Sequence, residues 1–95
     1  MTVVVSFRGR KVIHTVADAA KTTLGEIADA TAEYLGQPAF PGVSKKNPYR
    51  LRSPSGQLLR RDAVLGFRYR FDANEYGVMC YRLSVQRKEQ AHAAS

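Results

Sequence analysis

The chain has 95 residues and a formal net charge of +7 at pH 7, from 15 lysines and arginines against 8 acidic residues. This length allows one domain with a single core. The one cysteine excludes an intramolecular disulfide, a thiolate zinc site and an iron–sulfur cluster built by this chain alone. No apolar run approaches the roughly 18 residues that a membrane span needs, and the opening MTVVVSFRGR is too short and charged too early for a signal peptide, so we expect a cytoplasmic protein.

The N-terminal residues predict a β-hairpin. Residues 2–8 read TVVVSFR and residues 12–16 read VIHTV, two β-branched runs separated by a turn-prone segment that contains Gly9. The second run offers two alternating sets of side chains for the core, either Val12, His14 and Val16 or Ile13, Thr15 and Ala17. We expect Ile13 to face the core.

Residues 22–35, TTLGEIADATAEYL, predict a helix, and we expect it to be the only one. Thr23 followed by Glu26 fits a capping box at its start, and Gly36 can end it in the left-handed conformation. At about 100° per residue, one side carries the residues that we expect in the core: Leu24, Ile27, Ala28, Thr31, Tyr34 and Leu35. The opposite side carries the acids that we expect in water: Glu26, Asp29 and Glu33.

The middle of the chain predicts a loop followed by half-exposed strands. Residues 37–48 contain three prolines together with Lys45 and Lys46, which is typical of a loop. Residues 49–52 (YRLR) and 67–71 (FRYRF) alternate apolar or aromatic residues with arginine, as strands with one buried face do. The side chains expected on their core side are Tyr49, Leu51, Phe67, Tyr69 and Phe71.

Between these two segments we expect a turn at SPSG, a very short strand at residues 56–59 and a connection whose Val64 and Leu65 fill the core. Residues 72–77, DANEYG, predict a loop. The last strand, residues 78–85, alternates two sets of side chains, with Met79, Tyr81, Leu83 and Val85 opposite Cys80, Arg82 and Ser84.

These elements predict an α+β fold with one helix on one face of a mixed sheet of four to five strands. The first and last strands should lie side by side in the middle of the sheet. Residues 1–86 are expected to form the domain. Residues 87–95 have no apolar anchor, and we expect them to be a disordered tail.

Three segments resemble ubiquitin-like β-grasp proteins: the hairpin VVVSFRGRKVIHTV, the Thr-capped helix ending in LGQPAFP, and YRLRSPSGQLLRRDAVLGF. The resemblance covers residues 2–86 and implies the β-grasp fold. Conjugated members and sulfur carriers of this superfamily end in Gly-Gly, whereas no glycine follows Gly77 here. The resemblance therefore implies a non-conjugating member, similar to Ras-association-type modules or to small bacterial ubiquitin-like proteins that accompany secretion systems.

Arginine is the main candidate for function. Alternation places several arginines on the outward side of the sheet, where ubiquitin presents an apolar patch to its partners. Guanidinium groups clustered in this way suit carboxylate or phosphate ligands, although arginine is also an ordinary outer residue of half-buried sheets. The expected partner-binding residues are Arg50, Arg52, Arg68, Arg70 and Arg82, with Arg8 and Arg10 of the hairpin turn in addition.

Other chemistry is not indicated by the sequence. His14 and His92 lie far apart and lack further residues at metal-ligand spacing, and Cys80 has no neighbouring histidine in sequence that would activate it. We expect no catalytic residues, no metal and no cofactor.

The expected function is that of a non-enzymatic interaction module or adaptor that binds an acidic protein partner through the basic sheet face. One alternative is a protein modifier of a bacterial conjugation system with an atypical or processed C-terminus. Another is a nucleic-acid-binding domain, although aromatic residues on the core side argue against it. The acidic helix side and the basic sheet could also support head-to-tail self-association.

Overall fold

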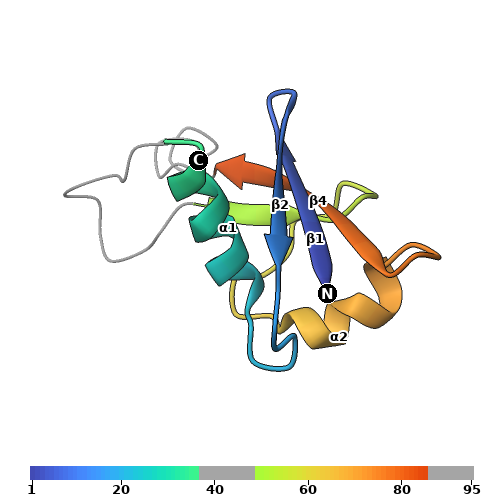
Figure 1. Cartoon of the computed structure of the whole chain (residues 1–95). Coiled ribbons are helices and arrows are strands. Elements are labelled where there is room, and N and C mark those ends of the chain that lie inside the picture. Colours follow the sequence, from blue (N-terminus) through green and yellow to red (C-terminus); the bar gives the residue numbers. More distant parts are fainter. Residues whose placement is uncertain (37–48, 86–95) are drawn as a thin grey trace, which may run out of the picture.

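The computed structural model describes residues 1–36 and 49–85 of the chain. They form an α+β structure with four strands and two helices (Figure 1). The elements in chain order are β1 (Thr2–Phe7), β2 (Arg10–Thr15), α1 (Leu24–Tyr34), β3 (Tyr49–Arg52), α2 (Leu65–Asp72) and β4 (Val78–Val85). The loop predicted at residues 37–48, with Lys45 and Lys46, and the tail predicted at residues 87–95 lie outside the described residues.

The four strands form one mixed sheet in the order β2-β1-β4-β3. The first and last strands, β1 and β4, run parallel in the middle, and β2 and β3 pair antiparallel with them at the two sides. This arrangement confirms the predicted neighbourhood of the first and last strands. The number of strands agrees with the expected four to five, whereas the expectation of a single helix is wrong.

The hairpin of β1 and β2 closes through a turn of only two residues. Arg8 and Gly9 both have positive φ, 49° and 80°, as a type I′ turn requires. This turn pairs Phe7 with Arg10 and Val5 with Val12, so Val12 is buried. Ile13 must then lie on the other side of the sheet, where it is 70% exposed, and the prediction that Ile13 faces the core is wrong.

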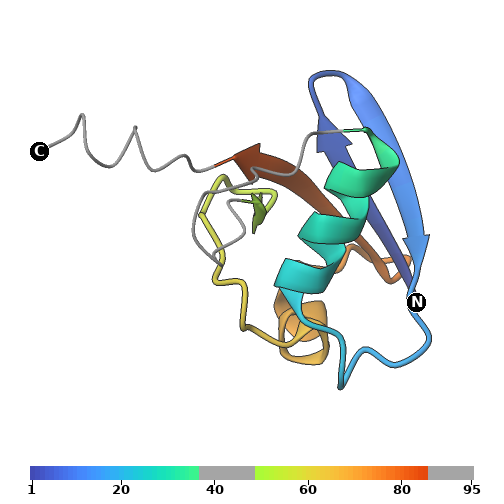
Figure 2. The same ribbon diagram turned by 90° about the vertical axis from the view of Figure 1, so that its left-hand side faces the viewer.

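Helix α1 lies across one face of the sheet (Figure 2). Its capping box is present, because the Thr23 hydroxyl accepts from the Glu26 N–H and the Glu26 carboxylate accepts from the Thr23 N–H, both at 3.2 Å. Gly36 follows the helix with a φ of 69°, as predicted. Tyr34, at the margin of the apolar stripe in the last turn, is 74% exposed rather than buried, and Ala32 is buried in the stripe.

Helix α2 occupies the segment FRYRF, which alternation had suggested as a strand. Its start is held by the loop before α1, because the N–H of Leu65 donates to the carbonyl of Thr22 and the N–H of Gly66 donates to that of Ala19. Leu65 is fully buried, but Val64 before it is 36% exposed, so only one of the two residues expected in the core lies there. These hydrogen bonds to Thr22 and Ala19 stabilise the first turn of a helix in a segment whose sequence pattern also fits a strand.

The remaining elements follow the sequence pattern. In β3 Tyr49 and Leu51 are buried, and in β4 Met79, Tyr81 and Leu83 are buried. The very short strand expected at residues 56–59 is reduced to one bridge between Leu58 and Arg52. The core therefore lies between α1 and the side of the sheet that these residues share.

Candidate functional site

The side of the sheet opposite α1, here called the outer face, carries the candidate site. Successive residues of a strand point to opposite faces of the sheet, so the residues next to a buried one lie on the outer face. Their partners on the neighbouring strands lie on the same face. The pairing places Lys11 opposite Ser6, Ser6 beside Arg82, and Arg82 opposite Arg52. These residues form one row across all four strands. Arg50 lies two residues before Arg52 on the same side of β3, opposite Ser84.

We call the four basic residues of this face, Lys11, Arg50, Arg52 and Arg82, the basic strip. Three of them were predicted from the alternation in β3 and β4. Lys11 was not predicted on this face, because the register of β2 depends on the two-residue turn at Arg8 and Gly9. Recognising a type I′ turn would have placed Lys11 on the outer face.

Arg52 and Arg82 are direct partners across β3 and β4. Nη1 of Arg52 donates to the carbonyl of Gly56 at 2.9 Å, and a β-carbon on Gly56 would lie 3.3 Å from Nη2 of Arg82. Both guanidinium groups thus meet at Gly56, in the turn after β3. Within residues 1–36 and 49–85 neither of them forms an ion pair.

Two like charges directly opposite each other on neighbouring strands destabilise a sheet by a few tenths to about 1 kcal/mol. Arg52 satisfies one donor on a neutral carbonyl, which does not offset its charge. Arg82 is exposed. The two arginines therefore present an uncompensated positive charge to solvent and favour an anionic ligand.

Arg50 has a more structural position in the basic strip. Its Nε donates to the carbonyl of Leu59 at 3.0 Å, and the N–H of Leu59 donates to the carbonyl of Leu51 at 2.9 Å. These bonds hold the segment around Leu59 against the edge of β3 that does not pair with β4. Replacing Arg50 would disturb this edge as well as the charge of the outer face.

Arg68 and Arg70 do not belong to the outer face, because FRYRF is helical. Arg68 is half-buried on α2, with its guanidinium carbon 6.0 Å from the centre of the Phe67 ring and its buried Nε without a hydrogen-bond partner in the described structure. Arg70 is exposed on the same helix. The prediction of a sheet face that includes these two arginines is wrong in this respect.

Arg8 and Arg10 lie at the tip of the hairpin and do not extend the basic strip. The guanidinium carbon of Arg8 lies 4.9 Å from the centre of the Phe7 ring. Arg10 pairs with Phe7 and lies two residues before the buried Val12, so it is on the same face of β2 as Val12. Lys11 lies on the opposite face. The side chains of Arg8 and Arg10 both remain exposed at the end of the sheet.

Beside the basic strip the outer face has an apolar row. Val4 pairs with Ile13 on one side and with Cys80 on the other. Ile13 is 70% exposed and the Cys80 thiol is free and exposed. This row was not predicted, because Ile13 was expected in the core.

A second exposed surface lies on α2. Phe67 and Phe71, which we call the aromatic patch, are 63% and 69% exposed, and their ring centres are 5.3 Å apart. Both had been expected in the core. They are four residues apart on the helix and therefore neighbours on its surface, close in sequence to Arg68 and Arg70.

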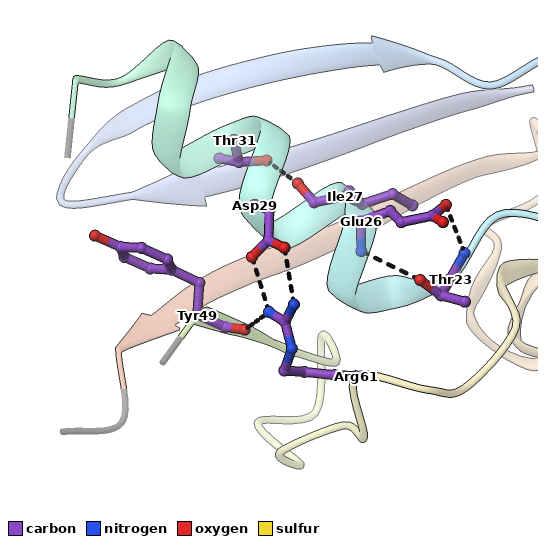
Figure 3. A network of polar contacts seen from close by, with 7 residues as sticks. All are labelled: Thr23, Glu26, Ile27, Asp29, Thr31, Tyr49 and Arg61. Carbon is purple, nitrogen blue, oxygen red and sulfur yellow. Dashed lines mark hydrogen bonds and ion pairs between the residues drawn. The ribbon is translucent and has the colours of Figure 1, made fainter. Parts of the chain in front are cut away.

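The acids of α1 are more engaged than the sequence suggested. Glu26 closes the capping box, and Asp29 accepts two hydrogen bonds from Arg61 (Figure 3). Glu26 and Glu33 are exposed, as predicted, whereas Asp29 is half-buried. Because Asp29 is paired with Arg61, fewer carboxylates of α1 are available for head-to-tail self-association.

Other chemical groups do not gather into a site in the described part of the chain. Residues 1–36 and 49–85 contain no group of three or more histidine, cysteine, aspartate or glutamate side chains that could hold a metal ion. His14 makes a hydrogen bond of 2.7 Å with Thr31 on α1, as a structural residue does. Among the described helices none is long and apolar enough to cross a membrane.

No protein-family model matches the sequence, and no curated protein is significantly similar to it. The geometry of the outer face is therefore the basis for a functional proposal.

Proposed function

We propose that the chain is a small non-enzymatic, ubiquitin-like interaction module of the β-grasp type, whose basic strip binds an acidic surface of a partner protein. The β-grasp assignment is supported by the N-terminal hairpin, the helix across one face and the parallel pair of β1 and β4. The observation that carries the functional proposal is the opposed pair Arg52 and Arg82 on the outer face, in one row with Lys11.

Charge and surface composition favour a protein as the partner. A net charge of +7 attracts acidic molecules in general. The apolar row of Ile13, Val4 and Cys80 beside the basic strip adds a surface that can bury the side chains of a protein. Interfaces between proteins combine such an apolar centre with charged surroundings.

The test compares two double variants that remove the same charge. Arg52→Gln/Arg82→Gln changes the basic strip, and Arg60→Gln/Arg70→Gln removes two exposed arginines elsewhere. Tagged wild type and both variants are used to capture partners from native lysate, and the captured proteins are identified. A partner that binds wild type and the control variant, but is lost with Arg52→Gln/Arg82→Gln, supports the proposal. If Arg52→Gln/Arg82→Gln captures the same partners as wild type and the control variant, the basic strip is excluded as the binding surface.

A protein modifier remains the competing proposal for a ubiquitin-like chain. Covalent attachment would produce a ladder of higher-mass bands on denaturing blots of the tagged chain. A single band at the monomer mass, together with partner capture under native conditions, would favour the interaction module.

Nucleic-acid binding is a second candidate, and the aromatic patch is the observation that favours it. Exposed aromatic rings beside arginines can stack on bases while the arginines contact phosphates. This proposal predicts that a labelled single-stranded oligonucleotide binds with an affinity that falls steeply with salt. Phe67→Ser/Phe71→Ser should weaken oligonucleotide binding. In Arg52→Gln/Arg82→Gln, where the aromatic patch is intact, the stacking contribution to binding should remain.

A further inference from the structure

We propose that Arg52 and Arg82 form a site for a phosphate monoester, carried by a phosphorylated side chain of the partner protein. The inference rests on the proposed function, because it takes the basic strip as the surface on which the partner docks. It adds the chemical identity of the group that is recognised.

Both guanidinium groups lie beside Gly56. Arg52 reaches Gly56 through its bond of 2.9 Å to the Gly56 carbonyl. Arg82 comes from the neighbouring strand to within 3.3 Å of where a β-carbon of Gly56 would lie. The absence of a side chain at Gly56 allows the Arg82 guanidinium to approach the turn this closely.

The charge of the pair matches a phosphate better than a carboxylate. A carboxylate carries one negative charge and would leave one of the two arginines uncompensated. A phosphorylated side chain carries about −1.5 to −2 charges near pH 7 and three acceptor oxygens. These oxygens can accept from two guanidinium forks at once.

The surroundings of the pair favour a peptide as the carrier. Cys80 of the apolar row precedes Arg82 by two residues on the same side of β4, a separation of roughly 7 Å along a strand. A peptide can place an apolar side chain on that row while its phosphate lies between the arginines. Single-stranded nucleic acid is favoured by aromatic platforms, but the aromatic patch belongs to α2 rather than to the outer face.

The experiment uses the whole chain and three immobilised peptide libraries with the same randomised flanking positions. The central residue is phosphoserine in the first library, glutamate in the second and serine in the third. We expect wild type to be retained by the phosphoserine library at least about tenfold more strongly than by the glutamate library. Arg52→Gln/Arg82→Gln should lose this preference, and Arg60→Gln/Arg70→Gln should keep it.

A further variant separates the geometry of the site from its charge. Arg52→Lys/Arg82→Lys preserves both charges but removes the two forks, so most of the phosphoserine preference should disappear. Circular dichroism of each variant establishes that it is folded before retention is compared. Backbone amide shifts of Arg52, Gly56 and Arg82 on addition of a selected phosphopeptide locate the contact.

Several results would overturn the phosphate site. Equal retention by the phosphoserine and glutamate libraries, or no retention by either, excludes a preference for phosphate. If partner capture still depends on Arg52 and Arg82 in that case, the proposed acidic-surface binding stands and only the phosphate site falls. Stronger binding to a 5′-phosphorylated oligonucleotide or to phosphatidic acid vesicles, abolished by Arg52→Gln/Arg82→Gln, would overturn the assignment to a peptide.

Discussion

Arg61 and Asp29 join two parts of the chain that are 32 positions apart. Nη1 and Nη2 of Arg61 donate to the two carboxylate oxygens of Asp29, each at 2.8 Å (Figure 3). Nη1 also donates to the carbonyl of Tyr49, the first residue of β3. One guanidinium group therefore connects α1, β3 and the segment that precedes α2.

We predict that Arg61→Met lowers the free energy of unfolding by about 1–2 kcal/mol. The side chains of Arg61 and Asp29 are 32% and 38% exposed, so solvent screens part of the interaction. The bidentate geometry and the additional bond to Tyr49 make it stronger than an ordinary surface pair. Urea unfolding followed by circular dichroism measures the change.

Arg60 provides a matched control one residue away. It pairs with Asp62, but these side chains are 77% and 69% exposed and close in sequence. Arg60→Met should change stability by no more than about 0.5 kcal/mol. Equal losses for the two variants would show that the Arg61 connection does not stabilise the fold beyond a surface pair.

Gly25 in the first turn of α1 makes a second connection to the same segment. Its N–H donates to the carbonyl of Arg61 at 2.9 Å, and a β-carbon on Gly25 would lie 2.9 Å from that oxygen. We predict that Gly25→Ala destabilises the protein by about 1–2 kcal/mol, although alanine favours a helix by roughly 1 kcal/mol. Chemical unfolding measures the difference.

The exposed Ala30 of α1 calibrates helix propensity in the same element. Ala30→Gly should cost about 1 kcal/mol through propensity alone. If Gly25→Ala stabilises the protein by the amount that Ala30→Gly destabilises it, the close approach of Arg61 does not restrict position 25.

Local signals predicted the elements whose ends are determined by neighbouring residues. Thr23 and Glu26 identify the start of α1, and the β-branched runs identify β1 and β2. Residues 67–71 were mispredicted because alternating aromatic and basic residues fit a strand, while the bonds that hold the start of α2 come from Ala19 and Thr22. Distant contacts of this kind are not visible in the local sequence pattern.

The candidate site was predictable only in part for the same reason. Arg52 and Arg82 follow from alternation within strands that were predicted correctly. Lys11 and Ile13 depend on the register of the hairpin, which the positive φ of Arg8 and Gly9 determines. A shift of one residue in register exchanges the two faces of β2. For this reason neither Lys11 of the basic strip nor Ile13 of the apolar row was predicted on the outer face.

Tyr81 leads to a third prediction, because its buried hydroxyl donates to Asp72 on α2 at 3.3 Å. Burial first, and then the charge of Asp72 and its hydrogen bond, raise the pKa of Tyr81 well above its usual value of 10.0. Tyr81→Phe should lower the free energy of unfolding by about 0.5–1 kcal/mol at neutral pH, since the bond is long. Urea unfolding of both proteins measures the difference.

The pH dependence of this difference tests its cause. A raised phenol pKa stabilises the folded state fully below pH 10, and this stabilisation is lost as pH rises above that value, because the unfolded chain releases the proton first. The gap between wild type and Tyr81→Phe should therefore shrink in alkaline solution. A gap that stays constant above pH 10 would contradict a raised pKa of Tyr81.

His14 of β2 has a defined protonation pattern in its contact with α1. The Thr31 hydroxyl donates its single hydrogen to the carbonyl of Ile27 at 2.8 Å. The same oxygen lies 2.7 Å from Nε2 of His14 and must accept the hydrogen of that nitrogen. Burial lowers the pKa of His14 below its ordinary value of 6.5, since the charged ring would be partly removed from water.

We predict that this contact makes the protein less stable in mild acid. With a lowered pKa in the folded state, the unfolded chain binds the proton first, so the stabilisation is complete above pH 6.5 and is lost as pH falls below it. The free energy of unfolding should decrease as the pH falls from about 6.5 to about 5.5. In His14→Gln, whose amide can still donate to Thr31 but does not titrate, the decrease should be smaller. The same decrease in both proteins, or an NMR titration of His14 with a midpoint above 6.5, would contradict the predicted effect of burial.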